Sequence, residues 1–200
     1  MKDGPESMYD TFARVHQNQE SLDNAHGGSN FLGWHRLYVL FFENALRRIA
    51  PGLVLCYWDP TLDYMMKSTL QIHSVTFSDR LFGNGYGTVI NGPFKNWQLF
   101  EPYNYRLRRN IGQEGSLTRP EVIDIITLNP KIIRSTQISS GLGAIGFKDP
   151  DTGRRHSLEQ CHDNTHVYVG EVFSSLPITA QDPIFWFFHA YVDYVWELFR

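Results

Sequence analysis

Cysteine is scarce in this sequence: Cys56 and Cys161 are the only two among 200 residues. Two cysteines are too few for a disulfide framework, and these lie too far apart in sequence to form a zinc-type cysteine pair. They could both be buried and reduced, or they could pair with each other. The residues alone favour neither alternative.

Excess positive charge and long apolar runs are also lacking. The formal net charge is -3 and no basic stretch is present, which argues against a nucleic-acid partner. No apolar run reaches the roughly 18 residues expected of a membrane-spanning helix, so no membrane partner is expected. The opening M-K-D-G-P-E-S-M lacks the apolar centre of a signal peptide. Nothing in the sequence indicates an oligomeric state.

What the sequence has is enough apolar material for a core. A hydrophobic content of 42% and a charged content of 20% are ordinary for a soluble globular protein. Aromatic residues make up 14% of the chain, and they crowd around the segments that carry histidine. We therefore expect one domain over residues 1–200.

The last twenty residues, 181–200, predict a central helix around which the rest of the chain is organised. Asp182 can cap its first amides, and Pro183 suits the first helical position, where no amide donor is needed. The segment is apolar almost all round, so it should lie inside a bundle. His189 and, one turn later, Asp193 are its polar exceptions. Asp193 could accept from an Asn or Arg neighbour, orient a metal-bound imidazole by a hydrogen bond, or be a buried and satisfied carboxylate.

Three further helices are expected to carry histidine. A short amphipathic segment over residues 9–15 ends at His16, and a strong apolar pattern over 31–49 has His35 in its first turn. Residues 158–169 form a third helix that ends at Gly170. His26 is expected on a loop, because residues 17–30 are polar and contain glycine.

The middle of the chain, from residue 61 to about 157, has a different pattern. Glycine-rich turns alternate there with short aromatic pieces, and K-D-P-D-T-G at 148–153 predicts a turn. Residues 118–121 have the spacing of a capping box and predict a local helix. So long an irregular stretch in a compact domain is typical of loops over a functional site. The expected fold class is therefore mainly α, with long irregular loops between two histidine-bearing halves.

Six of the eight histidines fall into two groups without cysteine, namely His16, His26, His35 and His162, His166, His189. The i, i+4 spacing in the second group places two imidazoles on one helix face. Neutral imidazole suits zinc, copper, iron or nickel. The H-E-x-x-H pattern of zinc peptidases is absent, because residues 162–166 read H-D-N-T-H. Two triads on four helices predict a pair of metals facing each other in a bundle, without identifying the metal. The other two, His73 and His156, are expected to face solvent.

Two longer motifs resemble a known family. F-L-G-W-H-R-L-Y-V-L-F-F-E at 31–43 resembles the first copper signature of the type-3 copper proteins, which are the tyrosinases, catechol oxidases and hemocyanins. D-P-I-F-W-F-F-H-A-Y-V-D-Y-V-W at 182–196 resembles the second. Y-W-D-P-T-L-D at 57–63 and pieces of 82–94 are similar to the intervening segments of secreted invertebrate tyrosinases. The resemblance covers nearly the whole chain.

This resemblance implies a four-helix bundle around two copper ions, with O2 as co-substrate and a small phenolic or catecholic substrate. By position, His16, His26 and His35 would bind the first copper, and His162, His166 and His189 the second. The alternative for His16 is a surface histidine at a helix end, since the loop before His26 varies in length across the family. Family habit also implies secretion. The end of the chain at the second copper helix suggests a domain cut from a longer protein.

Departures from the family pattern concern the surroundings of the second copper. Phe188 stands where many members have a second His, which makes the neighbourhood of the ligands more apolar. Asp163, followed by Asn164, stands where many tyrosinases have the Asn that helps a Glu to orient a proton-accepting water. Asp163 could do this directly, or it could weaken monophenol oxidation relative to diphenol oxidation. Glu159, one turn before His162, is the candidate for holding that water, unless it is an ordinary exposed helix residue.

Two further positions bear on site chemistry and access. Asn24 occupies the place where some relatives have a Cys crosslinked to the second ligand, so no thioether can form, and Cys161 is not at the crosslinking position. Phe185, one turn before His189, is expected to pack against the ligand rings. Leu176 could narrow the entrance to the site or could belong to the core.

The implied activity is that of a binuclear copper oxidase, which hydroxylates monophenols and oxidises o-diphenols to o-quinones, as in melanin biosynthesis. Two alternatives stay open. One is an oxygen carrier like a hemocyanin unit, which would shield the same coppers. The other is a structural matrix protein whose copper site is vestigial.

Overall fold

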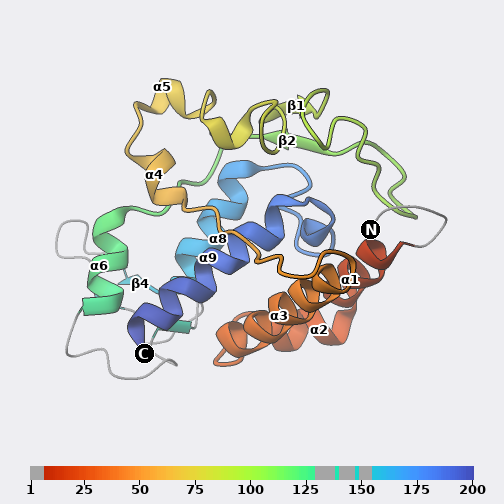
Figure 1. The fold of residues 1–200 in the computed structure, drawn as a ribbon. Helices are drawn as coiled ribbons and strands as arrows, with labels where there is room; N and C mark the ends of the chain where they lie inside the picture. The colour runs from red at the N-terminus through yellow and green to blue at the C-terminus, as the bar shows by residue number, and fades with distance from the viewer. Residues whose placement is uncertain (1–6, 129–137, 140–146, 149–154) are drawn as a thin grey trace.

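The protein is mostly helical in the computed structural model, which describes residues 7–128, 138–139, 147–148 and 155–200 (Figure 1). Its α-helices are α1 (Met8–Gln17), α2 (Gln19–Ala25), α3 (Phe31–Ile49), α4 (Pro60–Tyr64), α5 (Ser68–Gln71), α6 (Pro120–Leu128), α8 (Leu158–Val169) and α9 (Ile184–Phe199). Two 3-10 turns, η1 (Val75–Phe77) and η2 (Thr179–Gln181), complete the helical part. The predicted mainly α class is confirmed.

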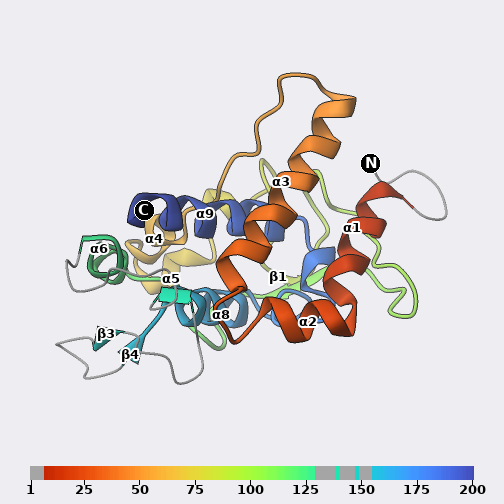
Figure 2. The same ribbon diagram turned by 90° about the horizontal axis from the view of Figure 1, so that it is seen from below.

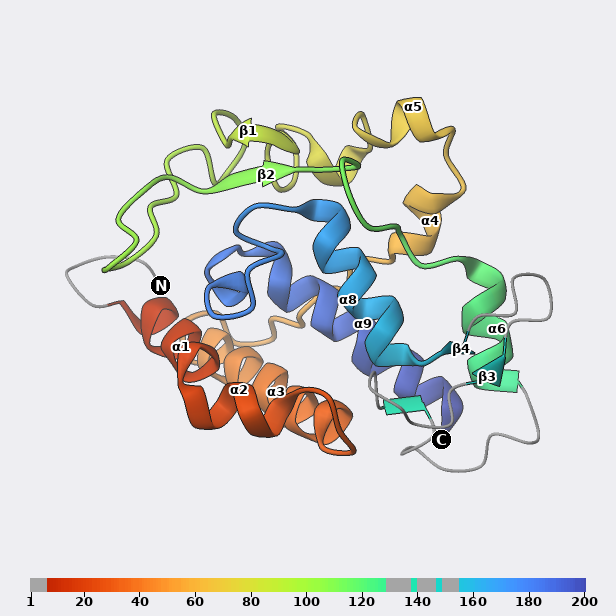
Figure 3. The same ribbon diagram turned by 180° about the vertical axis from the view of Figure 1, so that it is seen from behind.

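Helices α3, α8 and α9 surround the centre of the molecule. Helix α3 crosses α9 (Figure 2). Helices α1, α2 and α3 form one group on one side of α9. Helix α8 runs along α9 on the other side (Figure 3). The chain therefore brings its early and late histidine segments together. None of the helices in the described part of the chain is long and apolar enough to cross a membrane.

Local sequence signals define the ends of the histidine-bearing helices. Ser7 and Asp10 form a reciprocal capping box at the start of α1, which satisfies amides that have no partner inside the helix. Ser157 caps α8, and Gly170 ends it with a φ of 75°, a backbone conformation that favours glycine. Helices α3 and α8 cover 31–49 and 158–169, as predicted.

The loop predicted over the polar stretch 17–30 is partly helical, because it contains the seven-residue helix α2. His26 follows directly as the C-cap residue with extended backbone, so its predicted place on a loop is confirmed. The side chain of Asn18 starts the helix by accepting from the amide of Glu20. The segment also packs against α1 and α3. Capping and packing therefore form a helix where periodicity alone gave no signal.

The middle of the chain covers α8 on the side away from α1 (Figure 3). Two short antiparallel strands, β1 (Tyr86–Thr88) and β2 (Arg108–Asn110), pair with Tyr86 opposite Asn110. A second pair, β3 (Phe147–Lys148) and β4 (Arg155–His156), precedes α8. The predicted turn over 148–153 falls outside the described residues apart from Lys148. The predicted local helix is present as α6, although the hydroxyl of its expected cap, Thr118, contacts α8 at Thr165, 3.3 Å away.

A buried ion pair joins the irregular middle segment to the start of α9. The Arg109 guanidinium donates two hydrogen bonds of 2.7 Å to the Asp182 carboxylate, and both side chains are fully buried. Asp182 also accepts from the Ile184 amide, 3.2 Å away, so part of the predicted capping role is confirmed. A bidentate pair of this kind defines one geometry, and it sets where α9 begins.

The N-terminal half of α9 is buried and its C-terminal end is not. The Trp186 indole stacks on Phe42 of α3 with ring centroids 3.7 Å apart, whereas Tyr194 and Leu198 are exposed. Asp193 pairs with Arg36 of α3, which also donates to Glu197 at 3.0 Å. The expected arginine partner of Asp193 is therefore confirmed, and this carboxylate orients α3 against α9.

Candidate metal centre

The first three histidines meet although they come from three elements. His16 lies in the last turn of α1, His26 caps α2 and His35 lies in the first turns of α3. Their ring centroids are separated by 5.0 Å for His16–His26, 5.1 Å for His26–His35 and 5.8 Å for His16–His35. Each offers a ring nitrogen, and these nitrogens lie within 4.8 Å of one another. Three nitrogens at this spacing could hold one metal ion.

The second triad is tighter. His162 and His166 project from one face of α8, and His189 reaches them from α9. The Nε2 atom of His162 lies 2.8 Å from that of His166 and 3.1 Å from that of His189. Three Nε2 atoms converging on one point form a second place for a metal ion.

The two triads lie against each other. His35 and His189 stack with centroids 4.4 Å apart and an angle of 17° between the rings. Phe185 packs on His189 at 4.0 Å and on His16 at 5.1 Å, so its predicted packing against these rings is confirmed. Phe31 covers His35 and His162, each at 4.8 Å. An apolar shell of aromatic rings thus surrounds both triads.

Burial keeps four of these imidazoles neutral. It lowers the pKa of His16 to about 3, with the neighbouring His26 adding to the effect. Burial also lowers the pKa values of His35, His166 and His189 well below the ordinary value. At neutral pH these rings therefore carry a free lone pair, which is the form that binds metal.

Backbone carbonyls select which ring nitrogen faces inward. The Nδ1 atoms of His26 and His35 lie 3.1 Å from the Leu22 carbonyl and 2.8 Å from the Phe31 carbonyl. If Nδ1 carries the proton and donates it, the lone pair lies on Nε2. The Nε2 atoms of both rings are buried without a hydrogen-bond partner. A buried polar atom without a partner is costly, and a metal ion would supply the missing interaction, so these residues fit a metal pair.

Thr179 is a site residue that no sequence pattern predicted. Its hydroxyl lies 3.0 Å from His166 Nδ1 and donates to the Phe173 carbonyl at 2.8 Å. The same carbonyl lies 2.8 Å from His166 Nδ1. The Thr179 hydroxyl and the Phe173 carbonyl together orient the His166 imidazole, as hydrogen-bonded neighbours of metal ligands do. Thr179 is distant from His166 in sequence, and no local motif signals the contact.

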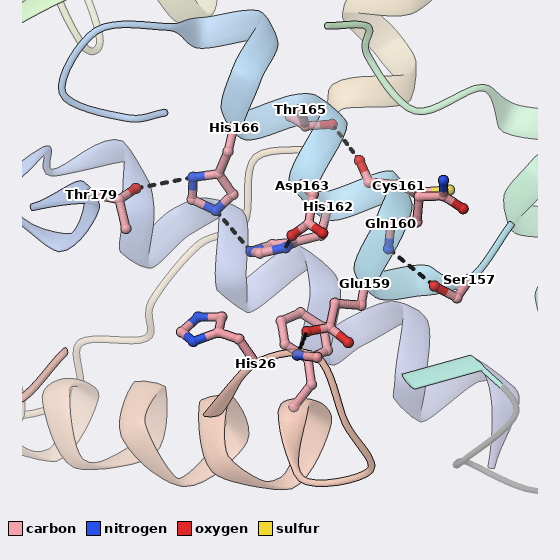
Figure 4. Close-up of polar contacts among 12 residues, drawn as sticks. His26, Ser157, Glu159, Gln160, Cys161, His162, Asp163, Thr165, His166 and Thr179 are labelled. Carbon is pink, nitrogen blue, oxygen red and sulfur yellow. Dashed lines mark hydrogen bonds and ion pairs between the residues drawn. The ribbon is translucent and has the colours of Figure 1, made fainter. Parts of the chain in front are cut away.

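A cavity of about 720 Å³ opens beside the triads. It is bordered by His26 and His166, and also by Glu159, Asp163, Asn164 and Leu176. Figure 4 shows the His26 ring between its own segment and the two α8 histidines, with Glu159 reaching from α8 toward that segment. The candidate acid–base residues therefore lie at the same opening as the metal-binding nitrogens.

These candidate residues differ in burial and partners. Glu159 is only 2% exposed and accepts from the Gly27 amide, so the alternative of an ordinary exposed helix residue is wrong. Asp163 is exposed, and its Oδ1 lies 3.0 Å from His162 Nδ1. Asn164 is half-buried, and its carbonyl accepts from the Ser116 amide at 3.3 Å. Leu176 is 42% exposed at the cavity, so it does not belong to the core.

The remaining predictions concern residues around the centre. Phe188 stacks on His162 at 5.4 Å, so it makes the second triad's surroundings apolar, as expected. Cys56 is exposed and Cys161 is buried, and both are free thiols; the pairing alternative is wrong. His73 is exposed, as predicted. The side chain of His156 lies outside the described part of the structure.

Comparison with known proteins agrees with this site. The sequence model of the common central domain of tyrosinase matches residues 6–200. The chain is 54% identical to tyrosinase-like protein 1 of Margaritifera margaritifera over 97% of this chain and 39% of that protein. It is 31% identical to the tyrosinase of Streptomyces lincolnensis over 95% of this chain and 71% of that protein.

Solved structures share the fold. A mutant polyphenol oxidase from Thermothelomyces thermophila superimposes with a TM-score of 0.71 and 21% identity, over 96% of this chain and 59% of that one. A tyrosinase from Burkholderia thailandensis gives a TM-score of 0.61 and 18% identity, over 98% of this chain and 54% of that one. The chain spans about two fifths of the length of the Margaritifera relative.

Proposed function

Because this chain belongs to the tyrosinase family, we propose that it is a copper oxidase domain that hydroxylates monophenols and oxidises o-diphenols to o-quinones with O2. The family's cofactor is a pair of copper ions, and the two histidine triads fit that pair. The observation that carries the proposal is the pair of histidine triads that stack at His35 and His189 beside an open cavity.

Each triad would hold one copper. His16, His26 and His35 would bind the first ion, and His162, His166 and His189 the second. The bound metals supply the redox chemistry with O2. The protein orients His26, His35 and His166 through the Leu22, Phe31 and Phe173 carbonyls.

The phenol proton needs an acceptor at the cavity. Glu159 supports this role, because its carboxylate is buried at the cavity and oriented by the Gly27 amide. It would hold a water that takes the proton from the incoming hydroxyl. Asp163 and Asn164 border the same cavity and would assist by binding that water. A positioned base of this kind contributes roughly 10²-fold or more to rate.

Within the described part of the chain, access to the triads supports an oxidase over an oxygen carrier. The cavity of about 720 Å³ is large enough for a small phenol. Leu176 is half-exposed at its border, where it would narrow the opening without closing it. A carrier would need this opening covered, and a vestigial site would not need all six imidazoles.

The test compares two metal forms of the same protein. Copper-loaded chain is assayed for O2 uptake and o-quinone formation with phenol and with 4-methylcatechol, after metal analysis. Zinc-loaded chain is the matched control, since zinc accepts the same imidazole ligands but undergoes no redox change. We expect two coppers per chain and quinone from both substrates in the copper form only. Two bound coppers without quinone would overturn the oxidase and favour the carrier.

A further inference from the structure

The outer border of the cavity carries negative charge from two helices. Asp23 of α2 and Asp163 of α8 are both exposed, and both line the cavity. Among the described residues that line it, Lys and Arg are absent. Glu159 adds a third carboxylate deeper inside. A rim with one sign of charge attracts ligands of the opposite sign.

Neither rim carboxylate, Asp23 or Asp163, has a Lys or Arg as its hydrogen-bond partner in the described part of the chain. Asp23 accepts from the neutral amide of Gln19 at 2.8 Å. Asp163 lies 3.0 Å from His162 Nδ1. Both carboxylates therefore face the cavity that His26 and His166 also line.

A phenol ring that approaches the triads would leave its para substituent near this rim. His26 and His166 border the inner part of the same cavity whose outer border carries Asp23 and Asp163. A short side chain of two carbons places its terminal group several ångströms from the ring, on the side of the solvent. That terminal group is the part of the substrate that the carboxylates can distinguish.

We propose that this site selects phenols and catechols whose para side chain ends in a cation, such as an ammonium group, over those ending in a carboxylate. The inference rests on the proposed oxidase function and names its substrate class. Asp23 and Asp163 are the specificity-determining residues.

The experiment uses copper-loaded full chain and three catechols of similar size, which carry a 2-aminoethyl, an ethyl or a 2-carboxyethyl group para to one hydroxyl. Relative to the neutral compound, we expect kcat/KM to be roughly threefold or more higher for the amine and lower by a similar factor for the acid. Raising the salt concentration should narrow both ratios, because exposed charges are screened.

Variants at the rim give the second measurement. Asp23→Asn should reduce the amine-to-acid ratio, and Asp23→Lys should reduce it further or reverse it. Asp79→Asn, which removes an exposed carboxylate that does not line the cavity, is the matched control and should leave the ratio unchanged.

The outcomes separate this inference from the proposed function. Equal kcat/KM for all three catechols, or a preference for the acid, would overturn charge selection while leaving the oxidase intact. If the amine-to-acid ratio of kcat/KM is the same in the Asp23 variants and in the parent, Asp23 does not determine specificity. Absence of quinone from every catechol would overturn the oxidase itself and charge selection with it.

Discussion

His35 and His189 lie face to face, with ring centroids 4.4 Å apart, although one belongs to α3 and the other to α9. This stack is the point at which the two triads meet. The packing of α3 against α9, supported by the Trp186–Phe42 stack, therefore determines how far apart two bound metals would lie. A change that shifts either α3 or α9 should therefore alter the position of histidines in both triads.

Removal of one imidazole should remove one metal. We expect His166→Ala to bind about one copper per chain and to lose oxidase activity, because two nitrogens at the second triad hold copper less tightly than three. Metal analysis after dialysis and quinone formation measure the two effects. His73→Ala, at an exposed histidine outside both triads, is the control. Full copper loading and activity in His166→Ala would show that the ligand assignment is wrong.

Glu159→Gln should separate catalysis from metal binding. The amide oxygen can still accept from the Gly27 amide, so copper loading should stay at the parent level. Loss of the carboxylate should lower kcat for monophenol hydroxylation by about 10²-fold. Steady-state kinetics with phenol measure this, and Glu121→Gln on the exposed face of α6 is the control. Unchanged kcat would exclude Glu159 as the base.

The hydroxyl of Thr179 should strengthen copper binding through His166. Thr179→Val preserves the shape of the side chain but removes the contact with His166 Nδ1, and copper affinity should fall about 10- to 100-fold. Competition with a chelator of known affinity measures the loss. Thr179→Ser retains the hydroxyl and should restore most of the affinity. Equal affinity in the Val variant and the parent would contradict the assignment.

The Arg109–Asp182 pair should matter more for stability than an exposed pair. Arg109→Met leaves the Asp182 carboxylate buried without its partner, which should cost about 3–5 kcal/mol of unfolding free energy. Arg200→Met breaks the exposed contact with Glu197 and should cost at most about 1 kcal/mol. Urea unfolding of the metal-free proteins measures both. If the two variants lose similar amounts of unfolding free energy, burial does not make the Arg109–Asp182 pair more important for stability than an exposed pair.

Much of the helical framework could be predicted from the sequence. The apolar pattern over 31–49 is strong, and Gly170 marks the end of the helix over 158–169. Helix α2 could not be predicted in this way, because its side chains are polar and its stability comes from the Asn18 cap and packing. Secretion and a role in melanin formation stay predictions.

The sequence by itself determined which side chains could bind metal: six histidines in two groups, held on periodic helices and accompanied by family motifs. Only the tertiary structure decided how they are used. Burial in a shell of aromatic rings lowers the pKa values of His16, His35, His166 and His189, which no local pattern reveals. Contacts between distant segments, namely Arg109 with Asp182 and Thr179 with His166, then orient α9 and the ligand ring, because such contacts depend on the path of the whole chain.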